Sequence, residues 1–492
     1  MTRLLKALFS LSFVLVAGCH EIHLDYSDDP GEIVLFDDLY SVSVPDREHA
    51  VAVGYYGSAY FTADGGDSWQ QGVTGTLASL YKVSMADALH GWAVGQRGLI
   101  LYTEDGGAHW TRQPNLKENE GVHLFGVAAI DEQTAVAIGE WGTRIRTEDG
   151  GNTWADNSFT VSESHPMFQW LSSFEQEKVR KGETVYEDVG INDVYCLGAP
   201  SRRCWLIGEF GYIFYSEDSG KTWKKSNIEG SRELPPVRFG YNEVEFDLSY
   251  VPELHSFAKS LLGEGHLNVA VEAVASKGEI EIFGRQGDPF DFFETLEARM
   301  QEVRTVLEDA GLESERVRLR GQPPWDFEDY LDKDPDFLER YYAGRLFDYP
   351  GVKVRVIQNP ILFTVRFRDE QHGMISGLGG VTLSTSDGGR NWAYGKLDRK
   401  LAVFSVASVA DRAIAVGEKG LIRVSSDGGR SWDIPREGLF PRISTFMRDM
   451  DFDPTGTVGL IVGQSGLILR SENAGYEWVS ILPPARESGE EG

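Results

Sequence analysis

Seven short segments of this chain carry an acidic or amide side chain in the same local setting. In each segment a Ser or Thr stands two residues before that side chain and a Trp five residues after it. Carboxyl groups act as general acids and nucleophiles in glycoside hydrolysis, so these positions are the first candidates for chemistry. The seven residues are Asp64, Asp105, Asp149, Asp218, Asp387, Asp427 and Asn473.

The repetition favours a structural role for these side chains. An Asp can cap the N–H groups of its own turn, the neighbouring glycines supply positive φ, and the Trp anchors the next strand. One such turn per repeat is what fold stabilisation predicts, and Asn473 keeps the capping oxygen while dropping the charge. We therefore predict no catalytic residue, no cofactor and no metal site.

The elements that position these turns are predicted strands. Residues 80–110 contain two alternating strands, a Gly-x-x-Gly turn, a third strand and then the acidic turn, and residues 39–69 repeat that order. A strand after the Trp makes four per unit. Where nothing is inserted, the Trp residues recur at about 40 to 46 residues, which is typical of propeller blades. We predict an all-β fold, a seven-bladed β-propeller with an inserted α+β domain.

The acidic turn is the Asp-box, or BNR, signature. The pattern VGxxGxIxxTxDGGxxW, repeated around a seven-bladed ring, resembles the photosystem II stability/assembly factor family and its relatives in non-photosynthetic bacteria. That resemblance implies a protein that holds or assembles a membrane protein complex. Sialidases share the box as well, so a divergent glycoside hydrolase is the alternative. The first blade carries only Arg47 where a sialidase has its N-terminal arginine motif.

The Gly-x-x-Gly turns are expected on the face opposite the boxes, near the central channel. Their inner residues include acids and aromatics, which suit a basic or amphipathic peptide, whereas the other interpretation is ordinary solvated turns. The predicted partner-binding rim comprises Glu140, Trp141, Glu209, Phe210 and Glu418.

The start of the chain is predicted to be a targeting segment. Arg3 and Lys6 precede an apolar run that ends in Val-Ala-Gly-Cys19, which resembles a bacterial lipobox. This resemblance implies cleavage after residue 18, acylation of Cys19 and, with His20 in second position, an anchor on the periplasmic side of the outer membrane. Residues 19–31 would be a tether.

The net charge of the chain bears on its binding partners, and its cysteines bear on a disulfide. The chain has 47 basic and 76 acidic residues and a net charge of −29, which argues against nucleic acid. Cys196 and Cys204 flank a turn on neighbouring predicted strands. A cross-strand disulfide and two free buried thiols are both open.

Two insertions interrupt the repeat. Residues 166–181 are predicted to include a short amphipathic helix. The propeller, residues 32–233 and 359–484, is divided by residues 234–358, for which we predict helices and strands, and residues 485–492 form a disordered tail. The helices are expected at 252–262, 292–310 and 335–345, and the strands at 244–246, 267–275, 279–283, 316–319 and 352–357.

The insert resembles OmpA-like peptidoglycan-associated domains. The resemblance lies in Arg299, Val303, Leu307 and Gly311 at steps of four, followed by a closing strand. In that family a helix Arg and a preceding Asp hold a diaminopimelate residue, so Arg299 and Asp288 are the implied ligands. Asp288 stands one residue away from the family's position. The alternative interpretation is that Arg299 lies on an exposed helical face and pairs with Glu302 or a neighbouring residue, contributing little.

These observations predict a lipid-anchored periplasmic scaffold that acts by binding a membrane or envelope protein. Peptidoglycan binding through the insert is a further alternative.

Overall fold

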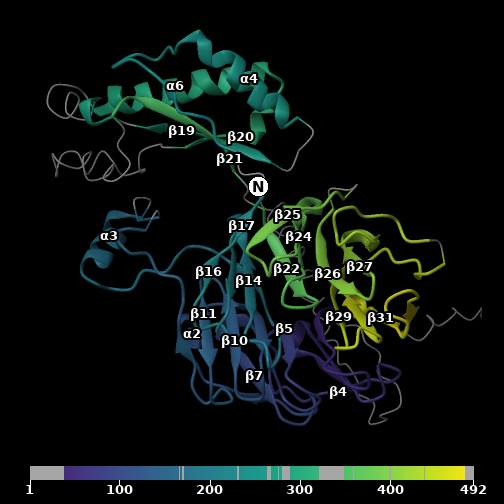
Figure 1. Ribbon diagram of the computed structural model, residues 1–492. Helices are drawn as coiled ribbons and strands as arrows, with labels where there is room; N and C mark the ends of the chain where they lie inside the picture. Colours follow the sequence, from purple (N-terminus) through teal and green to yellow (C-terminus); the bar gives the residue numbers. More distant parts are fainter. Residues whose placement is uncertain are drawn as a thin grey trace, which may run out of the picture. The chain divides into compact units, whose positions relative to one another are not determined.

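The computed structural model describes residues 38–481, apart from 166, 169–170, 230–231, 263–266, 275, 280–288, 321–347, 358–359, 398–400 and 437. Seven sheets, whose consecutive strands pair antiparallel, form the blades of a propeller (Figure 1). Their innermost strands contact one another in a closed cycle, β1, β5, β9, β13, β22, β26, β29 and back to β1. The predicted seven-bladed all-β fold is confirmed.

The strands follow the repeat along the chain. Blades one to four contain β1 (Leu39–Ser43), β2 (Ala50–Gly54), β3 (Ala59–Thr62) and β4 (Gln70–Gln71); β5 (Leu80–Met85), β6 (Gly91–Gly95), β7 (Ile100–Thr103) and β8 (Thr111–Arg112); β9 (Leu124–Ala129), β10 (Ala135–Gly139), β11 (Arg144–Thr147) and β12 (Ala155–Asp156); and β13 (Ile191–Cys196), β14 (Cys204–Gly208), β15 (Ile213–Ser216) and β16 (Lys224–Lys225).

Blades five to seven depart from four strands in two places. They contain β22 (Leu362–Phe367), β23 (Gly373–Gly377), β24 (Thr382–Thr385) and β25 (Asn391–Tyr394); β26 (Val403–Val409), β27 (Arg412–Gly417) and β28 (Ile422–Ser425); and β29 (Met447–Phe452), β30 (Gly459–Gly463), β31 (Ile468–Ser471) and β32 (Val479–Ser480). Blade five gains β17 (Asn227–Ile228), which pairs parallel to β25 before the chain enters the insert. Blade six is a three-stranded sheet, and Asp433 forms only an isolated bridge to Val424.

The hydrophobic core lies between adjacent blades. Val51 and Val53 of β2, for example, pack with Val83, Leu101 and Trp110 of blade two, and all five side chains are buried. Alternating strand residues face the two neighbouring blades, so each sheet is buried on both faces and the repeat is stabilised by apolar burial.

Each Asp box is a hydrogen-bonded turn between the third and fourth strands. In the first box, Asp64 accepts hydrogen bonds from the Thr62 hydroxyl at 2.7 Å and from the Ser68 N–H at 2.9 Å. Partial burial would raise its pKa, but these bonds lower the pKa of Asp64 to about 2. Asn473 accepts the matching bonds from the Ser471 hydroxyl and the Glu477 N–H. The box side chains thus bind their own turns.

A disulfide joins Cys196 at the end of β13 to Cys204 at the start of β14, two directly paired positions. The disulfide closes the turn at the box end of blade four, and the Cα atoms of the two cysteines lie 4.1 Å apart.

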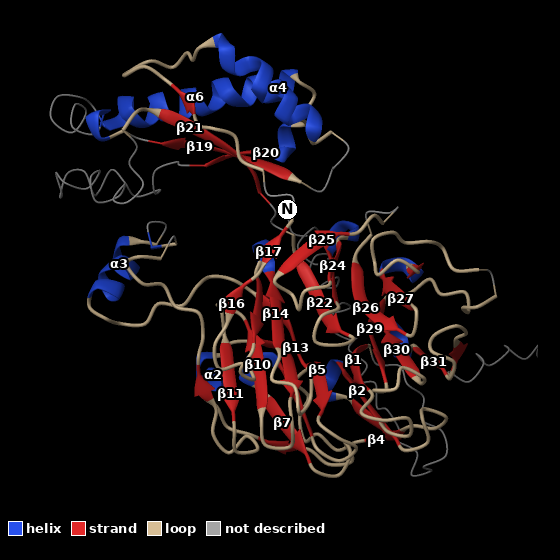
Figure 2. Cartoon of the chain, viewed as in Figure 1, coloured by secondary structure: helices blue, strands red, loops and turns tan. Residues whose placement is uncertain are grey.

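The insert has its own sheet and core. Its strands are ordered β18 (Val237–Arg238), β21 (Gly351–Ile357), β19 (Asn268–Val274) and β20 (Val317–Arg320), and β19 runs parallel to β20. Helices α4 (Val251–Ser260) and α6 (Pro289–Asp309) lie together on one side of this sheet (Figure 2). The remaining short 3-10 turns here are η5 (Leu248–Tyr250) and η6 (Ser314–Arg316).

Several local predictions for the insertions were wrong. Residues 277–279 are helical, because the Ser276 hydroxyl accepts the Glu279 N–H and starts a turn where a strand was expected. Residues 244–246 contribute only a bridge from Phe246 to Phe239. The short helix predicted within residues 166–181 is present as α3 (Ser173–Arg180), and it begins there because Ser172 and Glu175 form a capping box. The helix expected at 335–345 lies outside the described residues.

None of the helices in the described part of the chain combines the length and the apolar composition needed to cross a bilayer. Residues 1–37, which include Cys19 and the expected tether, and the expected tail at 485–492 lie outside the described residues.

Candidate interaction face

The face opposite the Asp boxes carries the Gly-x-x-Gly turns. In each Gly-x-x-Gly turn, the second of the two residues between the glycines lies in the left-handed region, with φ between 50° and 70°. Six of them are short 3-10 turns, η1 (Tyr55–Gly57), η2 (Gln96–Gly98), η4 (Glu209–Gly211), η7 (Leu378–Gly380), η8 (Glu418–Gly420) and η9 (Gln464–Gly466). Glycine fits this conformation best, and only blade five has glycine there, at Gly379.

Three blades instead place a large aromatic side chain in this strained position. Tyr56, Trp141 and Phe210 have φ values of 50°, 52° and 54° and expose 61%, 49% and 57% of their surface. A left-handed conformation costs an L-residue roughly 1 to 2 kcal/mol. Because these rings remain so exposed, burial within the chain returns little of that cost. Exposed aromatics on one face are typical of interaction surfaces.

The acidic residues of the predicted rim have a different role from the expected one. The carboxylates of Glu140, Glu209 and Glu418 accept backbone N–H bonds from the residues just before the first strand of their own blades, at 2.9, 3.1 and 3.3 Å. These acids therefore fasten the turn to the innermost strand. Of the five predicted rim residues, Trp141 and Phe210 present free surface.

A second ring of side chains lies closer to the propeller axis. In every blade the pairing of the first two strands skips the second residue of the first strand, which forms a β-bulge. A bulge turns its extra residue out of the ladder. We call the seven bulged residues the collar: Tyr40, Tyr81, Phe125, Asn192, Phe363, Phe404 and Arg448.

Six of the seven collar side chains form two runs of neighbours in contact, Tyr40, Tyr81 and Phe125 in one and Phe363, Phe404 and Arg448 in the other. Ring centroids of consecutive blades lie 6.1 Å apart for Tyr40 and Tyr81, 6.0 Å for Tyr81 and Phe125, and 5.6 Å for Phe363 and Phe404. The Arg448 guanidinium lies 4.9 Å from the Phe404 ring. The Arg448 Nε atom is buried without a hydrogen-bond partner among the described residues.

A glycine at the end of each second strand makes the bulge possible. A Cβ on Gly139 would lie 2.0 Å from the His123 carbonyl oxygen. A Cβ on Gly54 or Gly417 would lie 2.1 Å from the carbonyl oxygen at the matching position of its own blade, Asp38 or Ala402. The backbone before the first strand can approach only because these residues lack a side chain. This glycine of the repeat therefore permits the bulge that displaces the collar residue in each blade.

Below the collar, four charged side chains cross the channel. We call them the axial cluster: Lys82, Asp193, Arg366 and Asp449. Arg366 binds Asp193 at 2.8 Å and Asp449 at 3.1 Å, while Lys82 binds Asp449 at 3.0 Å and lies 3.7 Å from Asp193. Burial would lower the pKa of Arg366, but both carboxylates hold it above its usual value.

The axial cluster joins blades two, four, five and seven across the axis. Lys82, Asp193 and Asp449 each directly follow a collar residue, and Arg366 lies three residues after Phe363. The four side chains of the cluster are between 2% and 13% exposed. Paired charges from four blades therefore link the inner strands of the propeller across its axis.

The carboxylates on the inner strands also close the ring. Asp449 and Asp451 of β29 accept hydrogen bonds from the N–H groups of Val42 in β1 and of Val44 just after β1, at 3.4 and 2.8 Å. Serines make the same bond in other blades, as when the Ser41 hydroxyl accepts the Val83 N–H. No described cation lies within ion-pair distance of Asp451, and burial raises its pKa to about 6.

Arg299 of the insert lies in a different environment from the exposed one considered above. Its side chain is fully buried, and its guanidinium binds Glu279 at 2.7 Å and the Gly240 and Glu243 carbonyl oxygens. The expected partner Glu302 is wrong, because Arg299 points into the core between helix and sheet. Its Nη1 atom has no described partner, and Asp288 lies outside the described residues.

Asp87, His90 and Glu132 are the one group in the described residues whose ligand atoms lie close enough to hold a metal ion. The His90 ring already bonds Asp87 at 2.9 Å, and the same Asp–His turn recurs at Asp46 and Asp369. This recurrence is typical of a turn motif, so we assign no metal site.

Comparison with known proteins gave one family match and several matches in fold. Residues 31–168 and 348–434 match the family described as photosynthesis system II assembly factor YCF48. No curated protein matches the sequence.

Among solved structures, YCF48 from Cyanidioschyzon merolae has 13% identity and a TM-score of 0.48, covering 90% of this chain and 97% of its own. YCF48 bound to D1 peptide has 16% identity and a TM-score of 0.31, covering 80% and 91%. The GH74 xyloglucanase from Xanthomonas campestris has 12% identity and a TM-score of 0.46, covering 92% and 55%. Over those two matched ranges, and in its seven Asp-box blades, the chain is similar to the photosystem II assembly factor family.

Proposed function

We propose that this protein is a non-catalytic scaffold that binds a polypeptide segment of a membrane or envelope protein. The segment binds on the face opposite the Asp boxes, which carries the collar and the Gly-x-x-Gly turns and which we call the collar face. The observation that carries the proposal is the set of exposed aromatic residues held in left-handed turns around the collar. The match to a family of assembly factors supports the same kind of role.

Binding rather than catalysis is supported by the state of the carboxylates. The box acids accept hydrogen bonds within their own turns, and a pKa of about 2, as at Asp64 and Asp427, suits an acceptor and not a proton donor at neutral pH. Hydrolysis of any substrate in a panel of fluorogenic glycosides would overturn this part of the proposal.

Pull-down from detergent-solubilised membranes tests the binding face. The full-length protein should recover a defined partner, and the double variant Trp141→Gly, Phe210→Gly should recover at least tenfold less, because glycine keeps the left-handed turn and removes only the ring. Leu89→Ala is the matched control, since Leu89 is 51% exposed in a turn that bonds the box of the same blade. Equal loss from the control, or no loss from the double variant, would contradict the collar face as the site.

The proposed anchor is a lipid on Cys19 that holds the scaffold on the periplasmic side of the outer membrane. The lipobox-like sequence supports it. We expect Cys19→Ser to move the protein from the outer-membrane fraction to the periplasm and to abolish labelling with a palmitate analogue. An unchanged fractionation would refute the anchor without touching the binding proposal.

A second candidate is peptidoglycan binding by the insert, which rests on the resemblance of Arg299, Val303, Leu307 and Gly311 to OmpA-like domains. Sedimentation with purified peptidoglycan, compared between the natural protein and Arg299→Lys, tests it. Lysine retains the charge near Glu279 but cannot offer two donors in a plane. Absence of co-sedimentation of the natural protein would remove this candidate.

A further inference from the structure

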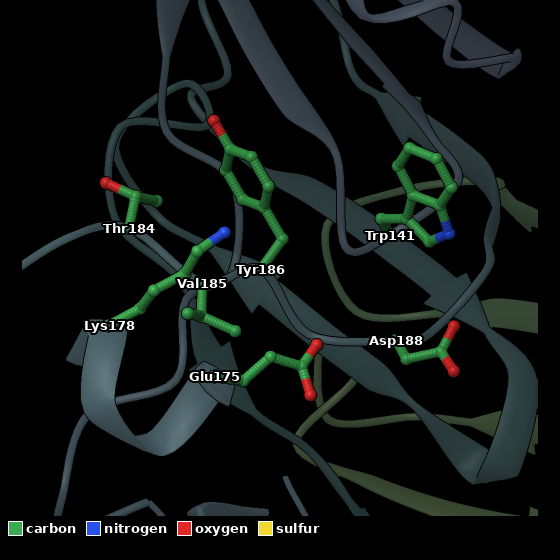
Figure 3. A pocket seen from close by; sticks show the side chains of 7 residues that line it. All are labelled: Trp141, Glu175, Lys178, Thr184, Val185, Tyr186 and Asp188. Carbon is green, nitrogen blue, oxygen red and sulfur yellow. The ribbon is translucent and has the colours of Figure 1, made fainter. Parts of the chain in front are cut away.

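A pocket of about 380 Å³ opens beside the turn that carries Trp141. Figure 3 shows its lining residues Trp141, Glu175, Lys178, Thr184, Val185, Tyr186 and Asp188. Trp141 comes from the Gly-x-x-Gly turn of blade three, and the others come from α3 and the segment after it. The first insertion of the repeat therefore builds the remaining wall of this pocket.

One side of the pocket is an indole ring with an open face. Trp141 is 49% exposed, and its left-handed backbone holds the ring outward at a cost that glycine would avoid. The face of a Trp ring attracts cations, and Arg or Lys over such a face gains about 0.5 to 2 kcal/mol.

The carboxylates of the pocket are incompletely used. The Asp188 side chain is exposed, and no described residue donates a hydrogen bond to it or forms an ion pair with it. Glu175 accepts from Ser172 through Oε2 only, which leaves Oε1 available. Lys178 also lines the pocket and carries a positive charge. Its Nζ atom lies 4.7 Å from the centroid of the Phe174 ring, and Phe174 is not a lining residue.

Neutral side chains form the rest of the pocket lining. The Tyr186 hydroxyl donates to Asp156 at 3.0 Å and the Lys117 Nζ atom lies 4.0 Å from the centroid of the Tyr186 ring, so Tyr186 offers no free donor. Val185 is buried and adds an apolar contact. At about 380 Å³ the pocket is near the lower end of ligand sites, and it suits one long side chain better than a cofactor.

From these contacts we infer that this pocket binds a Lys or Arg side chain of the partner polypeptide, with the cation between the Trp141 ring and the carboxylates of Asp188 and Glu175. The inference rests on the proposed function, because the pocket would bind one side chain of a polypeptide segment that also contacts the collar face. It assigns a specificity to that face that the collar alone does not provide.

Selection from a random peptide display library tests the inference. The full-length protein in detergent is the bait, and Trp141→Gly, Asp188→Asn and Glu175→Gln are the variants. Glutamine preserves the capping box of α3, and glycine preserves the turn of Trp141. Glu183→Gln is the matched control, because Glu183 is an exposed acid of the same segment that does not line the pocket.

We expect peptides selected on the natural protein to be enriched in Lys or Arg at one position, and Asp188→Asn to bind them at least tenfold more weakly. The control should bind them with unchanged affinity, and replacing the basic residue with Met in the peptide should remove the difference between Asp188→Asn and the natural protein. Peptides selected without a basic position would refute the pocket assignment alone. Failure to select any peptide would count against the proposed function as well.

Discussion

Replacing Asp451 with Asn should stabilise the propeller at neutral pH, although Asp451 accepts a hydrogen bond that helps close the ring. Burial raises the pKa of Asp451 to about 6 from an ordinary value of 3.8, and no described cation pairs with it. A carboxyl group whose pKa is higher in the folded state binds a proton more tightly there, so the folded state loses relative stability as pH rises through that window. Asn can still accept the Val44 N–H and does not ionise.

The magnitude follows from the two pKa values. At pH 4 the ionisation of Asp451 should reduce the free energy of unfolding by about 0.5 kcal/mol, and at pH 7 by about 3 kcal/mol, on the basis of 1.36 kcal/mol for each pKa unit. The stability advantage of Asp451→Asn should therefore grow by about 2.5 kcal/mol between pH 4 and pH 7.

Urea unfolding followed by Trp fluorescence at several pH values measures this difference, since each box places a Trp between blades. Asp453→Asn is the matched control two residues further along, because bonds from Thr455 and Val458 outweigh burial and lower the pKa of Asp453. That variant should be less stable at pH 7, with a deficit that shrinks as pH falls below the ordinary value. An Asp451→Asn advantage that stays constant or reverses with rising pH would refute the reasoning.

Three further predictions concern the repeat itself. Gly139→Ala should destabilise the fold by several kcal/mol, because its Cβ would meet the His123 oxygen at 2.0 Å, whereas Gly121→Ala, with open space around it, should cost only about 1 kcal/mol in a thermal melt. Asp427→Ala should cost about 1 kcal/mol by removing the acceptor for Ser431, and Asp427→Asn should cost less, because Asn473 shows that the amide supports the turn; equal losses would contradict capping. Replacing Cys196 and Cys204 together with Ser should lower stability by about 2 to 3 kcal/mol in non-reducing denaturation, and should abolish the effect of added reductant.

The sequence by itself determined the number of blades and the role of the Asp boxes. Local chemistry decides both, since Asp64 and Asn473 bind donors within four residues of themselves, and the Trp that follows packs between blades wherever the motif recurs. It also placed Trp141 and Phe210 on the face opposite the boxes, because strand alternation and turn order decide which end of a blade a residue occupies.

Only the tertiary structure decided what lies on the axis. The collar residues are visible in the sequence as the second residue of each first strand, but a regular strand would turn them toward a neighbouring blade. The bulge that redirects them depends on backbone contact across two strands. The axial cluster joins Lys82 to Asp449, 367 positions along the chain, and no local pattern pairs such residues. Likewise, the turn acids faced the backbone instead of solvent, because the closing ring brought N–H groups within their reach.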